Sequence, residues 1–263
     1  MNAVLAELPM PGRAAHMIER NLHVYRRTWI VIVSGFFEPV FYLLGIGLGI
    51  GALVGGVRLD DGRTVPYAVF VAPALMASAA MNGAIYESTF NLFFKLTYTK
   101  LFETVLATPM STRDIAVGEV SWALIRGSLY SIAFLLVMAV LGDAPSPWTP
   151  LALPACSLIG FSFAAVGTAA TTFMRKWQDF DLVMLVLIPF FLFSGTFFPV
   201  SAYPGALRWL VEAAPLYRGV HLVRALTTGT IEPLIALDVG YLAVLGGAGV
   251  LVTRARLDRL LRR

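Results

Sequence analysis

The sequence predicts an all-α polytopic membrane protein with six transmembrane helices. Of its 263 residues, 58% are hydrophobic and only 14% are charged, whereas soluble domains carry about 25% charged residues. Apolar runs of about 20 residues, the length that crosses a bilayer, recur along the chain between short polar connections. We therefore expect residues 1–263 to form a single transmembrane domain.

An N-terminal interfacial helix is expected at residues 13–28. Apolar residues recur on one face of this stretch and Arg and His residues on another, which is typical of a helix lying in the membrane interface. A soluble helix is the alternative, but the adjacent apolar run favours the interface. Residues 1–12 show neither a compact apolar core nor a small-residue cleavage site, so no signal peptide is expected.

The first span is expected at residues 29–54, which is longer than the roughly 20 residues needed and implies tilt or kinking. Glu38 lies near its middle, and a carboxylate at that depth is costly and usually faces protein or water. Both a pathway role and a structural hydrogen bond to another helix are open for Glu38. Glycines at four-residue spacing between Gly45 and Gly56 allow close helix packing.

Five further apolar runs follow. They are expected as spans at residues 66–86, 119–142, 151–174, 180–198 and 234–252. Gly160, Ala164 and Thr168 form a small-residue packing stripe on one of them. The run 180–198 is short and contains Pro189, which predicts a kinked span.

Between the second and third spans lies a polar interval, residues 95–118, that we call the coupling segment. A helix is expected from Leu96 to Ala107, stopped at Thr108 because the residue before Pro109 is pushed out of the helical region. A stiff segment on one side of the membrane is suited to receive a push from a soluble partner.

The coupling segment continues into the third span. Ser111 stands three residues before Asp114, which is an N-cap signature for a second helix that passes Glu119. Arg126 lies two turns further on the same face, and we expect it to compensate the charge of Glu119 near the membrane boundary.

The distribution of basic residues predicts the orientation. Of the 20 Lys and Arg residues, 14 lie in the N-terminal stretch, the coupling segment, the turn at residues 175–176 and the C-terminal tail, whereas 5 lie in the intervening outer segments. Since cytoplasmic segments are enriched in Lys and Arg, both termini and the coupling segment are expected in the cytoplasm.

Two stretches resemble a known family. LFETVLATPMSTRDIAVGE at residues 101–119 and PLYRGVHLVRALTTG at residues 215–229 resemble segments of the ABC-2 type transporter permeases, especially the branch with the NodJ-type nodulation-factor exporters and drug-exporter permeases. The resemblance implies a permease subunit of an ATP-binding cassette exporter. Its partners would be separate ATPase subunits, a second permease copy or a paralogue, and the lipid bilayer, but no nucleic acid.

The resemblance also implies an outer re-entrant helical hairpin at residues 201–232, with short helices around Pro215. Tyr217 and Arg224 lie two turns apart on one helix face and are pathway candidates, able to reach a lipid head group or the pathway. Anchoring at the membrane interface is the simpler alternative for both.

The candidate residues for ATPase coupling all lie at residues 101–119. They are Leu101, Phe102, Glu103, Leu106, Thr108, Pro109, Ser111, Asp114 and Glu119. We expect Phe102 and Leu106 to seat in an apolar groove of the ATPase while Glu103 pairs with a basic residue on its rim.

The chain is expected not to be an enzyme by itself, and no cofactor, catalytic residue or metal site is expected. It has no Gly-Lys pair and no Gly-x-Gly-x-x-Gly spacing, so ATP and Mg would bind the partner ATPase. A membrane-embedded lipid-modifying enzyme and a passive channel are the alternatives. Aromatic and aliphatic spans suit an amphipathic cargo, such as a lipid-linked saccharide, a glycolipid or a hydrophobic drug, exported across the plasma or inner membrane.

Overall fold

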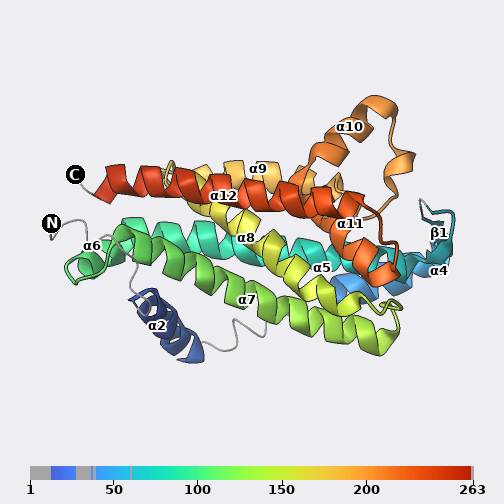
Figure 1. Cartoon of the computed structure of the whole chain (residues 1–263), viewed down its shortest axis with the longest axis horizontal. Helices are drawn as coiled ribbons and strands as arrows, with labels where there is room; N and C mark the ends of the chain where they lie inside the picture. The colour runs from blue at the N-terminus through green and yellow to red at the C-terminus, as the bar shows by residue number, and fades with distance from the viewer. Residues whose placement is uncertain (1–12, 28–36, 38–39, 60, 262–263) are drawn as a thin grey trace.

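Four long helices lie side by side along the long axis of the structure (Figure 1). The computed structural model describes residues 13–27, 37, 40–59 and 61–261. The four helices are α5 (Tyr67–Tyr86), α7 (Thr112–Leu141), α8 (Ala152–Thr171) and α12 (Leu234–Leu261). With the turns that extend some of them, the segments long and apolar enough to cross a membrane are Tyr67–Tyr98, Asp114–Leu141, Thr149–Thr171 and Leu234–Arg256. The predominantly helical membrane class is thus confirmed, while the total of six spans stays a prediction.

The two other predicted spans are shorter or only partly described. Of residues 29–54, the described part is an apolar helical run, Val40–Val54, containing the π-helix η1 (Leu43–Ile50) and α4 (Gly51–Val54). Residues 180–198 contribute α9 (Asp179–Leu192), which includes Pro189. Its 14 residues extend about 21 Å, less than the roughly 30 Å hydrocarbon core, so α9 does not cross a bilayer by itself.

Small residues let α8 pack closely against α5, α7 and α12. The predicted stripe of Gly160, Ala164 and Thr168 is buried in this packing. Helix α12 also lies close to α8, since a Cβ on Gly249 of α12 would lie 2.7 Å from the carbonyl carbon of Ala165 of α8. Such close approach matters in lipid because dispersion contacts, rather than the hydrophobic effect, hold helices together there.

At one end, the helix of α5 continues through two π-helical stretches, η2 (Glu87–Asn91) and η3 (Phe94–Tyr98), before α6 (Leu101–Leu106). The predicted helix start at Leu96 is wrong. Lys100 takes a left-handed conformation, with φ of 49°, and therefore separates η3 from α6.

The capping signature before α7 is confirmed. Ser111 Oγ accepts a hydrogen bond from Asp114 N at 3.2 Å, and Asp114 Oδ2 accepts one from Ser111 N at 2.9 Å. A cap of this kind stabilises a helix start by about 1 kcal/mol. Helix α7 then runs for 30 residues without interruption, so the end of the coupling segment and the third predicted span are one continuous helix.

The opposite end carries a hairpin and two shorter helices. Strands β1 (Gly56–Arg58) and β2 (Thr64–Pro66) pair antiparallel where only a polar connection was expected. The short helices predicted within residues 201–232 are confirmed as α10 (Gly205–Ala213) and α11 (Pro215–Thr228), preceded by the turn η5 (Val200–Ala202). Helix α11 packs against α5, α8 and α12, whereas α10 projects from the body (Figure 1). Membrane re-entry of this pair stays a prediction.

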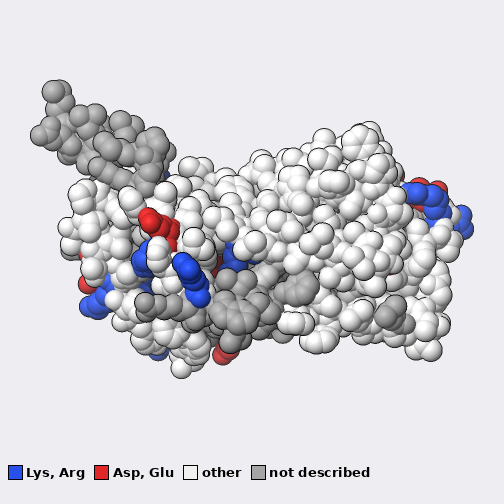
Figure 2. Space-filling model, turned by 90° about the horizontal axis from the view of Figure 1, so that it is seen from below, with Lys and Arg blue, Asp and Glu red and all other residues white. Residues whose placement is uncertain are grey.

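Charged side chains gather at the two ends of the face shown in Figure 2, with a broad zone almost without charge between them. This is the surface pattern of a protein that spans a bilayer. Helix α2 (Arg13–Arg27), α6 and the C-terminal end of α12 share one end, whereas β1 and α10 lie toward the other (Figure 1).

Candidate coupling site and adjoining pocket

A buried ionic cluster lies where the coupling segment joins the body. Glu87, at the start of η2, is 2% exposed, and its Oε2 accepts hydrogen bonds from Arg126 Nη1 at 2.6 Å and Asn91 Nδ2 at 2.7 Å. Arg126 belongs to the middle of α7, so the pair ties this helix to the extension of α5. Because a buried carboxylate is tolerated only when it is paired, Glu87 fixes how the two helices sit together.

A second ion pair extends the cluster toward the coupling segment. Lys95 Nζ, in η3, lies 2.5 Å from Glu119 Oε2 and 3.8 Å from Glu87 Oε1. Two carboxylates and two cations thus alternate, which offsets the desolvation cost of burying them. The predicted compensation of Arg126 by Glu119 is wrong, because each is paired instead with a residue of η2 or η3.

Helix α2 reaches the same cluster through Tyr25. The Tyr25 hydroxyl donates to Glu87 Oε2 at 3.1 Å and accepts from Arg126 Nη1 at 2.9 Å. Its ring packs against Trp122 of α7, with centroids 5.2 Å apart. Burial and the neighbouring Glu87 carboxylate raise the pKa of Tyr25 to about 12, so the phenol remains a protonated donor. Helices α2 and α7 and the extension of α5 therefore meet at one point.

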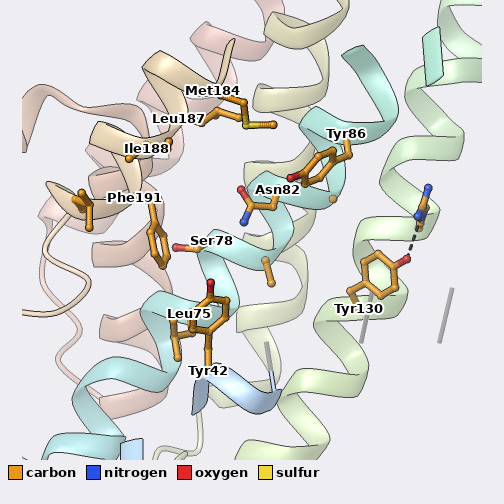
Figure 3. A pocket seen from close by; sticks show the side chains of 14 residues that line it. Tyr42, Leu75, Ser78, Asn82, Tyr86, Tyr130, Met184, Leu187, Ile188 and Phe191 are labelled. Atoms are coloured by element: carbon orange, nitrogen blue, oxygen red, sulfur yellow. Dashed lines mark hydrogen bonds between the residues drawn. The ribbon is translucent and has the colours of Figure 1, made fainter. Parts of the chain in front are cut away.

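A pocket of about 310 Å³ opens beside this cluster, between α5, α7 and α9 (Figure 3). Its polar lining includes Tyr42, Ser78, Asn82, Tyr86, Arg126 and Tyr130. Apolar side chains of α9 line it as well: Met184, Leu187, Ile188 and Phe191. Arg126 Nε donates to the Tyr130 hydroxyl at 3.0 Å. Since Arg126 belongs to both the cluster and the pocket lining, the two are contiguous.

Phe102 has different surroundings from those predicted. It is 2% exposed and packs in a small core with Met17 of α2, Leu92 and Ile115. The expectation that Phe102 seats in a groove of an ATPase is therefore contradicted, because its side chain already lies inside the protein. Its position instead joins α6 to α2 and α7.

The other predicted coupling residues divide into exposed and internal ones. Glu103, Thr108 and Pro109 are exposed, while Leu101 and Leu106 are half-buried against the core around Phe102. Ser111 and Asp114 form the cap of α7, and Glu119 belongs to the ionic cluster. The exposed surface of the segment is thus formed by part of α6 and the turn after it.

The pathway candidates lie elsewhere. Glu38 falls outside the described residues. Tyr217 and Arg224 are brought together at the end opposite the coupling segment, around a small cavity of about 70 Å³. Arg224 Nη2 donates to Gly195 O at 2.7 Å, and its Nε donates to Phe70 O at 3.1 Å. These contacts hold the Arg224 side chain against α5 and the turn at Gly195, and its role in a pathway stays a prediction.

Two buried acids that pair with cations of neighbouring helices, Glu87 and Asp238, were not among the predicted site residues. Glu87 lies one residue beyond the predicted span 66–86, where an acid resembles an ordinary interfacial residue. Asp238 of α12 is fully buried, with His221 Nδ1 at 2.6 Å and Arg218 Nη1 at 3.3 Å. Its signal was present, since an acid within the apolar run 234–252 implies a buried partner.

Comparison with known proteins identifies the family. The profile of the family described as ABC-2 type transporter matches residues 14–227, which include the coupling segment, the cluster and the pocket. The chain belongs to the ABC-2 type transporter family. Nodulation protein J of Rhizobium leguminosarum bv. viciae is 32% identical over 253 residues, covering 92% of this chain and 95% of that protein. Nodulation protein J of Sinorhizobium fredii is 34% identical over 207 residues, covering 78% of this chain and 77% of that protein.

Membership of this family makes the chain a membrane transport subunit rather than a catalytic enzyme.

Proposed function

We propose that this ABC-2 permease is the transmembrane subunit of an ATP-driven exporter of an amphipathic substrate. Separate ATPase subunits bind ATP and Mg and press on the coupling segment from the cytoplasm, where both termini lie. A second permease copy or a paralogue completes the pathway in the plasma or inner membrane. The contiguity of coupling segment, ionic cluster and pocket is the observation that carries this proposal.

The ionic cluster connects a movement of the coupling segment to the helices in the membrane. Force on the turn at Pro109 passes into α7 because the Ser111 cap joins the two without a flexible linker. Helix α7 carries Glu119, so its movement shifts this carboxylate relative to Lys95 of η3. Lys95 has Glu87 Oε1 at 3.8 Å as a second partner. When Glu119 moves away, Lys95 pairs with Glu87 instead, so its charge is never left without a partner.

The pocket has the chemistry of an amphipathic binding site. Hydroxyl, amide and guanidinium groups of its polar residues hydrogen-bond a polar head, and the apolar side chains of α9 contact a hydrocarbon or aromatic part. A lipid-linked saccharide, a glycolipid and a hydrophobic drug all share this two-sided chemistry. Because Arg126 lines the pocket, exchange in the cluster alters the pocket directly.

The experiment reconstitutes the chain and its co-purifying ATPase in proteoliposomes and measures ATP-dependent movement of a fluorescent glycolipid. We expect Asn82→Leu to lower transport about tenfold, as when hydrogen bonds worth about 1.4 kcal/mol are lost, with ATPase association unchanged. Gln178→Leu removes an exposed amide outside the pocket and serves as the matched control. Movement of the glycolipid that needs no ATPase would contradict the proposal and indicate a passive channel.

A further inference from the structure

A separate groove of about 650 Å³ runs between α7, α8 and α12. None of its lining residues lines the pocket beside Arg126. Its long part is apolar, with Val120 and Leu124 of α7 and Leu251 of α12, and its polar end holds Thr112 and Arg254. We propose that this groove binds one anionic phospholipid, with an acyl chain along the apolar part and the phosphate beside Arg254.

The groove has the length and direction that a lipid of one leaflet requires. From Thr112 to Leu124 it follows α7 for about 18 Å, slightly more than half of the roughly 30 Å hydrocarbon core. Its polar end lies near the start of α7 and the C-terminal end of α12, at the end of the molecule that also carries α6 (Figure 1). The phosphate would therefore lie at the water interface and the acyl chain in hydrocarbon.

Charge distinguishes the polar end from an ordinary lipid-facing surface. The Arg254 side chain is exposed, and it makes no hydrogen bond or ion pair with another residue that the structure describes. Arg256, two residues later, is already engaged, since it donates to Thr172 O at 3.3 Å and stacks on the Phe173 ring. A guanidinium that is free to form paired hydrogen bonds matches a phosphate group.

The shape of the groove depends on Gly247. A Cβ at this position would meet no protein atom within 4 Å, so packing between helices does not require glycine here. The neighbouring Gly246 and Gly249 differ, because a Cβ on either would clash with Phe161 or Ala165 of α8. The absence of a side chain at Gly247 thus leaves space beside the protein that an acyl chain fills.

Native mass spectrometry of the full chain in detergent micelles tests the site. Phosphatidylglycerol is titrated against phosphatidylcholine with the same acyl chains. We expect one phosphatidylglycerol to remain bound in preference to phosphatidylcholine. Arg254→Gln should weaken phosphatidylglycerol about tenfold and leave phosphatidylcholine unchanged, whereas Gly247→Leu should exclude both lipids.

Matched controls lie on the same helix. Arg259→Gln removes another exposed cation near the C-terminal end, and Gly240→Leu adds a side chain where a Cβ also meets nothing within 4 Å. Both should bind lipid like the unmodified chain. Equal binding of the two lipids, or unchanged binding by Arg254→Gln and Gly247→Leu, would overturn the proposal. So would a Gly247→Leu variant that alters only the oligomeric state, because a second copy would then occupy the groove. None of these outcomes depends on ATPase partners or on export.

Discussion

Replacing Glu87 by Leu tests the ionic cluster at its centre. The change removes the carboxylate that lies 2.6 Å from Arg126 and 3.8 Å from Lys95, while Lys95 keeps Glu119 at 2.5 Å. Arg126, whose side chain is 14% exposed, is then left mostly buried without its charge partner. Removing one member of a buried ion pair costs about 3–5 kcal/mol of unfolding free energy. We expect the unfolding midpoint in detergent micelles to fall by about 10 °C, taking roughly 2–4 °C per kcal/mol.

A double variant distinguishes lost pairing from damaged packing. Combining Glu87→Leu with Arg126→Met removes both charges, and replacing a whole buried pair by apolar groups is often close to neutral, within about 1–2 kcal/mol. The double variant should therefore be more stable than Glu87→Leu alone. Glu103→Leu is the matched control, because Glu103 is exposed and should change stability by about 0.5 kcal/mol or less. If Glu87→Leu were as stable as this control, or the double variant less stable than the single one, the cluster would not hold α7 as described.

Three further predictions concern α6, α2 and the orientation. Phe102→Ala should cost about 3–5 kcal/mol of stability in the same thermal assay, because it empties the core between α6, α2 and α7, whereas Phe102→Leu should cost far less. The raised pKa of Tyr25 means that the folded state keeps a proton that the unfolded state releases near pH 10, so its contribution is complete below about pH 10 and falls as the pH rises to about 12. Tyr25→Phe should show a smaller loss of stability over that range, and equal losses would count against the burial of this phenol. An impermeant thiol reagent applied to intact cells should label Ser146→Cys and spare Thr108→Cys, and labelling of the latter would reverse the orientation.

Local signals in the sequence predicted much of the fold. The Ser111 cap needs only the residues of one helix turn, and it was placed correctly. Pro215 marked the junction between α10 and α11 because a proline fits the first turn of a helix. The spans corresponding to α5, α7, α8 and α12 follow from the length of apolar runs. In each case the determining interaction is local, or is made with the surrounding lipid rather than with a distant part of the chain.

The ionic cluster could not be predicted in the same way. Glu87 and Arg126 are 39 residues apart, and their meeting depends on how the extension of α5 packs against α7. The π-helical turns of η2 and η3 change the rotation of this extension, so ordinary helical spacing does not place Glu87 or Lys95. Phe102 shows a related limit. An apolar helix face identifies a residue that is covered, but not whether the protein itself or a partner covers it.

The claim that α7 carries the ATPase stroke rigidly into the membrane is tested most directly by two glycines inserted after Pro109. The control inserts two glycines after Gly62, in the exposed turn of the β1–β2 hairpin at the opposite end. The measurement is glycolipid moved per ATP hydrolysed in proteoliposomes that contain the permease and its ATPase. Insertion after Pro109 should lower this ratio about tenfold with ATPase association intact, because a flexible linker absorbs the movement before it reaches the Ser111 cap. Insertion after Gly62 should leave the ratio unchanged. An unchanged ratio after insertion at Pro109 would contradict rigid transmission through α7.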